Sequence, residues 1–261
     1  MQSNNPVFNR NEGFAKSGGY ATFDQAPSAA TLEDMYAQPS ATPVRTGRIT
    51  YDDVVTKTGI MFAVLIVGAA VGWYVPGLWI VGMIVGLVLG LVNSFKREPN
   101  PALMLAYAGF QGLFIGGISH VFNDQWPGIV GQAVLGTLVL FAVALFAYRS
   151  GRIRVTPKFQ RGMLIAISGY VVLLLINLVS SLFGGPSIWS GENPALALAV
   201  SAFAVGLATL SLVLDFDFIE KGVRNGLPER FAWTAAFGLI VTLVWLYIEL
   251  LRLLAILRGD N

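Results

Sequence analysis

Apolar stretches of membrane-spanning length follow one another along most of the chain. Each is close to the roughly 20 apolar residues that a helix needs to cross a bilayer. The seven stretches are residues 58–75, 77–95, 101–122, 128–148, 159–183, 194–218 and 232–257. Prolines stand between them and at their starts, where the missing backbone donor of proline does little harm. The pattern predicts an all-α polytopic membrane protein with seven transmembrane helices.

The first 56 residues have a different composition. They are polar, with scattered proline, glycine, serine and asparagine and no sustained apolar period, so they cannot form a hydrophobic core. They also lack the basic, then apolar, then small-residue order of a secretory signal. We therefore expect a disordered N-terminal tail at residues 1–56, containing a short helix at 30–37, followed by a transmembrane domain at residues 57–261.

Composition excludes several classes of function. Only 12% of the residues are charged, about half the share in a soluble domain. With no cysteine and one histidine, no zinc or haem site is expected and no cofactor, and any metal must bind through oxygen. The net charge of +2 is spread between apolar stretches, which argues against a nucleic-acid partner.

No motif predicts an enzyme. The chain contains no phosphate-binding loop, dinucleotide fingerprint or metalloprotease histidine pair. Ser119 and His120 are adjacent, but neighbouring side chains on a helix point about 100° apart, so they do not form a hydrolase pair.

Lysine and arginine occur in alternate connections between the predicted helices. The second, fourth and sixth connections contain Lys96, Arg97, Arg149, Arg152, Arg154, Lys158, Arg161, Lys221, Arg224 and Arg230. The other three contain none and carry Trp73, Trp79, Trp126 and Trp189. Since basic loops remain cytoplasmic and tryptophans favour the interface, we expect a cytoplasmic N-terminus and an external C-terminus. Arg252 and Arg258 leave open a last helix that crosses incompletely.

Acidic residues at membrane depth are functional candidates, because a carboxylate in hydrocarbon is costly unless it is paired, hydrated or protonated. Asp215 and Asp217 lie at the inner end of the sixth span, after about twenty uncharged residues. Their spacing places them on different helix faces, and Asp215 is our choice for the inward-facing group. The alternative is an interfacial acidic edge, with Glu220 solvated, balanced by Lys221 and Arg224.

The last span contains a second unusual carboxylate, Glu249. Arg252 follows on the same helix face, so an intrahelical ion pair is one interpretation. Thr242 lies two turns earlier on that face. If this line of polar residues faces Asp215, it forms a cation site or proton relay. Gln111 in the third span is a further candidate, although a structural hydrogen bond between helices is the commoner role of such an amide.

Three segments together resemble the Bax inhibitor-1-like family, also called transmembrane BAX inhibitor motif proteins. They are Tyr107–Ser119, Asp215–Glu220 and the ending Thr242–Arg252, and their order matches as well as their content. The resemblance covers roughly residues 55 to 258. The polar tail, Pro127-Gly-Ile-Val and Val155-Thr-Pro-Lys-Phe resemble a bacterial, actinobacterial branch, which implies a multi-pass protein of the bacterial plasma membrane.

The resemblance implies a seven-helix bundle with the last helix near the centre, and a pH-sensitive calcium leak controlled by two aspartates that share a proton. Asp215 matches the first aspartate, but Thr242 stands in place of the second. The family's third-span glutamate falls on Gln111. Glu249 is then the favoured replacement for the missing acid, with Asp217 as an extra carboxylate; Thr242 is the other possible partner of Asp215.

The predicted function is a pH-sensitive cation channel or exchanger that conducts calcium, with the bilayer, calcium and protons as partners and Asp215 as the one possible metal ligand. Two alternatives stay open. One is an ion-coupled transporter of a small solute. The other is a non-conducting adaptor that binds a membrane protease or a stress-response protein.

Overall fold

Helices account for nearly all of the described chain. The structure is a computed structural model that describes residues 47–189 and 193–259, and within them no β-strand is formed. The elements are α5 Tyr51–Tyr74, η1 Pro76–Leu78, α6 Trp79–Phe95, α7 Pro101–Gln125, α8 Ile129–Arg149, α9 Pro157–Leu182, α10 Pro194–Arg224, η2 Glu229–Phe231 and α11 Ala232–Gly259. Seven helical segments of this region are long and apolar enough to cross a membrane, so the predicted fold class is confirmed.

Side-chain caps fix the starts of three helices. Asn100, Thr156 and Asn193 each accept a hydrogen bond from a backbone N–H of the first turn, and a proline follows each of them. The cap satisfies one of the unpaired donors of that turn, and proline there has no donor to leave unpaired. These signals explain why α7, α9 and α10 begin within two residues of the predicted positions.

The first helix begins earlier than predicted. Thr50 and Asp53 form a capping box, in which the Asp53 N–H donates to Thr50 Oγ1 at 3.1 Å and the Thr50 N–H donates to Asp53 Oδ2 at 2.9 Å. Helix α5 therefore starts at Tyr51, so residues 51–56 of the predicted tail belong to this helix. The rest of that tail, with the short helix predicted at 30–37, lies outside the described residues.

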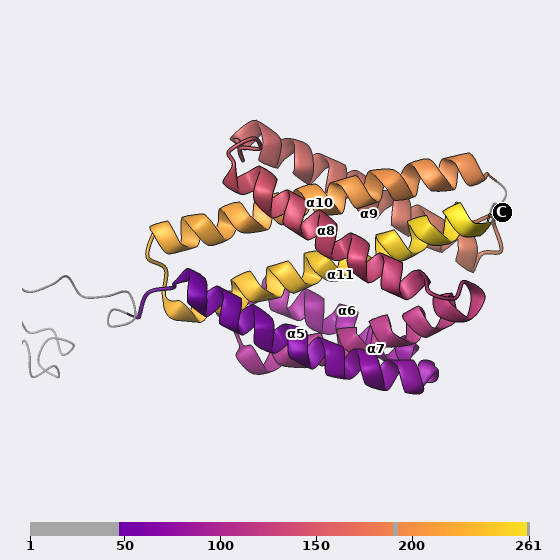
Figure 1. Cartoon of the computed structure of the whole chain (residues 1–261), viewed down its shortest axis with the longest axis horizontal. Coiled ribbons are helices and arrows are strands. Elements are labelled where there is room, and N and C mark those ends of the chain that lie inside the picture. Colours follow the sequence, from indigo (N-terminus) through magenta and orange to yellow (C-terminus); the bar gives the residue numbers. More distant parts are fainter. Residues whose placement is uncertain (1–46, 190–192, 260–261) are drawn as a thin grey trace, which may run out of the picture. The chain divides into compact units, whose positions relative to one another are not determined.

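Helix α11 occupies the centre of the bundle. It contacts α5, α7, α8 and α10, and in Figure 1 it runs between the group α5, α6 and α7 and the group α8, α9 and α10. Of its most apolar stretch, 56% of the residues are buried, against 11% for α9. The predicted central place of the last helix is confirmed, and α9 is the most exposed of the described helices.

Glycines allow α5 and α7 to pack in backbone contact. A Cβ atom added to Gly68 would collide with the carbonyl oxygen of Gly109, and one added to Gly116 would collide with that of Ala69. Small residues at such positions allow the close contact that stabilises helix pairs in lipid. This pair forms the most tightly packed interface of the bundle.

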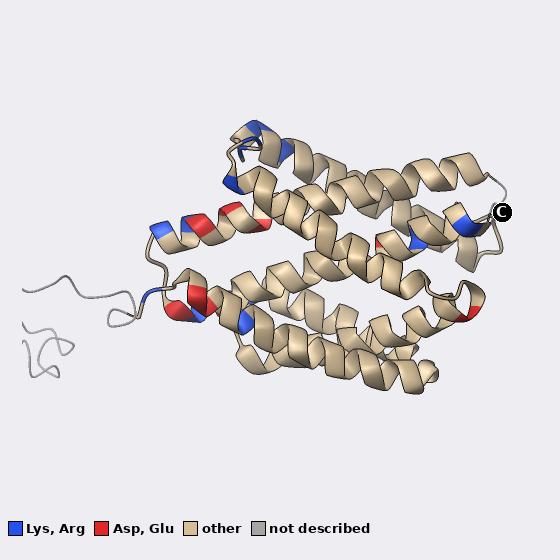
Figure 2. Cartoon of the chain, in the orientation of Figure 1, with Lys and Arg blue, Asp and Glu red and all other residues tan. Residues whose placement is uncertain are grey.

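Charged side chains gather at one end of the bundle. Figure 2 shows most of the Lys, Arg, Asp and Glu residues where α5 begins and α10 ends, whereas the middle of most helices is uncharged. We call this end the basic face, because it carries the α8–α9 connection with Arg149, Arg152, Arg154, Lys158 and Arg161. Its predicted cytoplasmic location stays a prediction.

Candidate ion-conducting site

Asp215 lies on α10 and faces the central helix. A Cβ atom added to Gly238 of α11 would lie 3.6 Å from Asp215 Oδ1, so the carboxyl group is packed against the α11 backbone. The hydroxyl of Thr242, one turn further along α11, interacts with the same carboxyl group. The other oxygen, Oδ2, is buried and has no hydrogen-bond partner within residues 47–189 and 193–259.

A hollow lined by four polar and two apolar residues, which we call the polar hollow, borders Asp215. It has a volume of about 380 Å³ and lies between the start of α9 and the last turns of α10; its lining residues are Gln160, Leu214, Asp215, Asp217, Phe218 and Lys221. Asp217 Oδ2 and Lys221 Nζ form an ion pair at 2.5 Å along α10. The hollow therefore connects the buried carboxyl group with the charged residues of the basic face.

Glu249 is buried in a separate cluster nearer the other end of α11, with 2% of its surface exposed. One oxygen, Oε1, accepts hydrogen bonds from the Tyr170 hydroxyl at 2.6 Å and from Trp245 Nε1 at 3.2 Å. The other, Oε2, is bound by Arg252 at 2.9 Å, and the Arg252 guanidinium lies 4.3 Å from the centre of the Trp189 ring. We call these five residues the Glu249 cluster.

The structure places Thr242, and not Glu249, beside Asp215. Glu249 follows Thr242 by seven residues, which is about 10 Å along a helix axis. Its oxygens are already bonded by Tyr170, Trp245 and Arg252. The interpretation of Glu249 as half of an intrahelical ion pair is confirmed, and the favoured interpretation of Glu249 as the direct partner of Asp215 is wrong for this conformation.

Two other predicted site residues lie elsewhere. Gln111 on α7 is directed at α6, where its Oε1 atom would lie 2.6 Å from a Cβ added to Gly86. Glu220 is not simply solvated, because it accepts a hydrogen bond from the Tyr148 hydroxyl of α8. Asp217 is paired with Lys221, as described above. Of the predicted residues, only Thr242 and Asp217 join Asp215 at one place.

Sequence reasoning missed Tyr170 and Gln160. Tyr170 is the one tyrosine of the predicted span 159–183. Only the fold brings its hydroxyl to Glu249 on another helix. A buried tyrosine hydroxyl usually has a hydrogen-bond partner, so a tyrosine in the middle of a span was a usable signal. Gln160 lies in the first turn of α9, where nothing in the sequence distinguishes it from a solvated surface residue.

Within the described residues, no three His, Asp or Glu side chains come together closely enough to hold a metal ion. Calcium takes six to eight oxygen ligands in its stable sites, and the Asp215 region offers far fewer.

Seven apolar helices, with α11 at the centre of the bundle, define an integral membrane protein in contact with the lipid bilayer. Its sequence matches the family model described as Bax inhibitor 1 like over residues 5–259, which is nearly the whole chain. The chain therefore belongs to the Bax inhibitor 1 like family, and the predicted resemblance is confirmed. No curated protein is similar enough to the sequence to match it.

Proposed function

We propose that the protein conducts cations, with calcium as the favoured ion, and that Asp215 is the charged group on the ion path. The Oδ2 atom of Asp215, which is buried and has no partner among the described residues, supports this proposal most directly. A buried carboxyl oxygen without a partner is costly. The cost of this oxygen at membrane depth is explained if the carboxyl group exchanges a proton or contacts a passing cation.

The polar hollow beside α9 supplies the entrance in this proposal. Asp217 and Lys221, which form an ion pair, line it together with Gln160. A cation that enters then meets the ionised Asp215, which lines the same hollow. Beyond it, Thr242 provides an oxygen that accepts a hydrogen bond from hydration water or contacts the ion.

The titration of one carboxyl group, that of Asp215, determines how cation conduction depends on pH. Protonated Asp215 is neutral and does not attract a cation, whereas ionised Asp215 does. Conduction is therefore expected at higher pH and lost as the pH falls through the titration of Asp215. Since Thr242 has no acidic proton in this range, the response is that of one group and not of two coupled carboxylates.

The test is calcium entry into liposomes that contain the purified full chain and a trapped indicator, followed across a pH series. Asp215→Asn keeps the size of the side chain and removes its charge, so it is expected to reduce the flux to the level of empty liposomes at every pH. Asp52→Asn is the matched control, because Asp52 is exposed in the first turn of α5. It is expected to leave flux and pH profile unchanged.

Other outcomes have distinct meanings. If correctly folded protein gives no cation flux at any pH, the proposal fails and a non-conducting adaptor is favoured. Flux that saturates with a small solute and depends on an ion gradient favours the coupled transporter. Calcium entry that is equal in the wild type and Asp215→Asn removes Asp215 from the path.

A further inference from the structure

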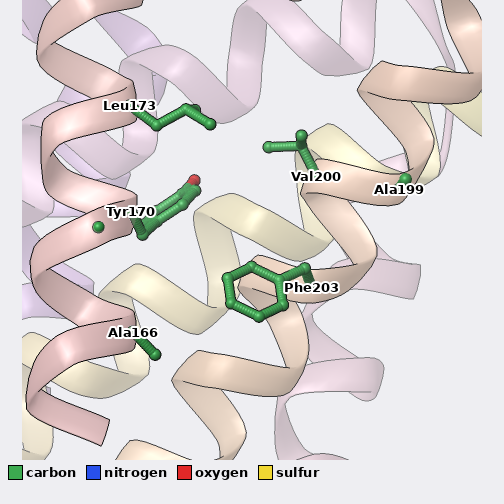
Figure 3. A pocket seen from close by; sticks show the side chains of 7 residues that line it. Ala166, Tyr170, Leu173, Ala199, Val200 and Phe203 are labelled. Carbon is green, nitrogen blue, oxygen red and sulfur yellow. The ribbon is translucent and has the colours of Figure 1, made fainter. Parts of the chain in front are cut away.

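An open apolar groove lies between α9 and α10, apart from the polar hollow. Its volume is about 420 Å³, and its lining residues are Ala166, Gly169, Tyr170, Leu173, Ala199, Val200 and Phe203. Figure 3 shows the α9 residues facing the α10 residues across an open space. We call this space the α9–α10 groove. It lies on the outside of the bundle, because Gly169, Ala199 and Phe203 are all exposed.

Gly169, a small residue of this groove, does not bring two helices into contact. A Cβ atom added to Gly169 would meet nothing within 4 Å. On α5 and α7, by contrast, added Cβ atoms at Gly68 and Gly116 would collide with the backbone of the neighbouring helix. Small residues in a membrane interface normally bring helices together. At Gly169 they leave space that another molecule can fill.

The chemistry of the groove restricts that molecule. Its one polar side chain, Tyr170, directs its hydroxyl to Glu249 at 2.6 Å and offers the groove only its ring. Large apolar side chains next to the groove, including Ile165 and Val172, are exposed on α9 as hydrocarbon-facing residues are. An apolar space in such a surface fits an alkyl chain and offers nothing to a polar solute.

Charge at the basic face indicates the headgroup. Lys158 and Arg161 lie in the first turns of α9, below the groove, and both are exposed. Neither forms an ion pair with a carboxylate in the part of the chain that the structure describes. Basic residues at a membrane surface attract anionic lipid, at about 1 kcal/mol per residue. Phosphate is therefore the complementary group for this pair.

The distance along α9 from its basic first turns to the groove fits the length of one lipid acyl chain. Ala166 follows the first residue of α9 by nine residues, which is about 13 Å along the helix. Half of a bilayer's hydrocarbon core is about 15 Å thick. A lipid whose phosphate contacts Lys158 and Arg161 thus places the far half of its acyl chain in the groove.

We propose that the α9–α10 groove binds an acyl chain of an anionic phospholipid from the leaflet at the basic face, with the lipid phosphate held by Lys158 and Arg161. This site is independent of ion conduction, and its test needs no flux measurement.

The test uses the full chain in vesicles that contain phosphatidylglycerol with a photoreactive group near the methyl end of one acyl chain. After illumination, the attached lipid is mapped by peptide mass spectrometry. Attachment is expected to concentrate on residues 166–173 and 199–203. Comparable exposed residues of α8, such as Leu135 and Leu138, report the background of unselective contact.

Gly169→Leu fills the groove with a side chain of the protein and is expected to reduce attachment at 166–173 and 199–203 to that background. Gly131→Leu is the matched control, because a Cβ there also meets nothing within 4 Å and Gly131 lies on α8, outside the groove. It should leave the attachment pattern unchanged. Thermal melting of both variants in detergent checks that they are folded.

Replacing Lys158 and Arg161 by glutamine tests the headgroup. With unlabelled phosphatidylglycerol or phosphatidylcholine as competitor, the wild type is expected to prefer the anionic lipid by a factor of about five for each basic residue. The double variant should lose this preference and keep the groove pattern. The proposal would be overturned if the lipid attached uniformly to all exposed helices, or if Gly169→Leu left attachment at the groove unchanged. Equal competition by the two lipids in the wild type would overturn the part that concerns the headgroup.

Discussion

The α5–α7 and α9–α10 interfaces use small residues in opposite ways. Between α5 and α7, glycines bring two backbones into contact, and there is no room for a single added methyl group at Gly68, Gly112 or Gly116. Between α9 and α10, Gly169 faces open space, and the two helices enclose a polar hollow and an apolar groove. A glycine in a membrane helix is therefore not enough to predict close packing. The element that lies opposite it in the fold must also be known.

The difference divides the bundle into a tightly packed part and a loosely packed part. Helix α9 has only Met163 and Tyr170 as buried residues among those described. The candidate residue Asp215 lies at the boundary, with the buried helix α11 on one side and the polar hollow beside α9 on the other. A displacement of α9 would widen the hollow without disturbing the α5–α7 contact.

The largest loss of stability is expected in the tightly packed part, at the α5–α7 interface. Gly116→Leu forces a side chain into the backbone of α5 at Ala69, and overpacking of this kind costs about 3 kcal/mol or more. The variant should melt far below the wild type in detergent, while Gly169→Leu melts close to it. Equal loss of stability in the two variants would contradict the contrast between the interfaces.

The next effect concerns the attachment of α9. Tyr170→Phe removes the hydroxyl that donates to Glu249 and leaves a buried carboxylate with one hydrogen bond fewer, at a cost of about 1–3 kcal/mol. Hydrogen exchange should increase selectively in α9, with little change in α5 and α7. Tyr148→Phe provides a comparison, because it removes a hydroxyl bond to Glu220 at the basic face instead; an equal increase in α9 exchange would speak against a specific role of Tyr170.

Much of the fold was predictable from the sequence, because a bilayer imposes the length and apolar content of each helix. Six of the seven helices start within two residues of the predicted positions, with α11 starting at Ala232 as predicted. The exception, α5, extends to Tyr51 because the capping box of Thr50 and Asp53 adds polar residues to the helix. An apolar stretch marks the part of a helix in lipid and says little about its ends in water.

The site was less predictable, because partners on different helices have no sequence spacing. Asp215 was chosen correctly as the residue that faces α11, but Glu249 was preferred to Thr242 as its neighbour. The i, i+3 spacing of Glu249 and Arg252 did predict their ion pair. Tyr170 completes that cluster from another helix, so its contribution emerges only from the fold.

A medium effect on conduction is expected from Thr242→Asp. The substitution places a second carboxyl group next to Asp215, and two carboxyl groups in contact share a proton and titrate as a pair. Calcium flux measured against pH should change from the profile of one group to a profile with two coupled steps. Thr242→Asn, which is similar in size to aspartate and uncharged, serves as the control and should keep a single step.

The smallest effect is expected from Gly238→Ala. The added Cβ atom would lie 3.6 Å from Asp215 Oδ1, an ordinary van der Waals contact, and alanine favours a helix by about 1 kcal/mol over glycine. Melting should occur at or slightly above the wild-type temperature, and the midpoint of the flux-against-pH curve should move only slightly. A complete loss of flux would mean that α11 must approach Asp215 more closely during conduction.

The most direct test of the central claim is to observe the protonation of Asp215 and the flux in the same sample. Infrared difference spectra of the protein in liposomes, recorded across a pH series, report protonated carboxyl groups in apolar surroundings. The account predicts one band that disappears as calcium flux rises, with the same midpoint, and that is absent in Asp215→Asn. A band that persists in Asp215→Asn, or a flux that rises while the Asp215 band stays constant, would contradict it.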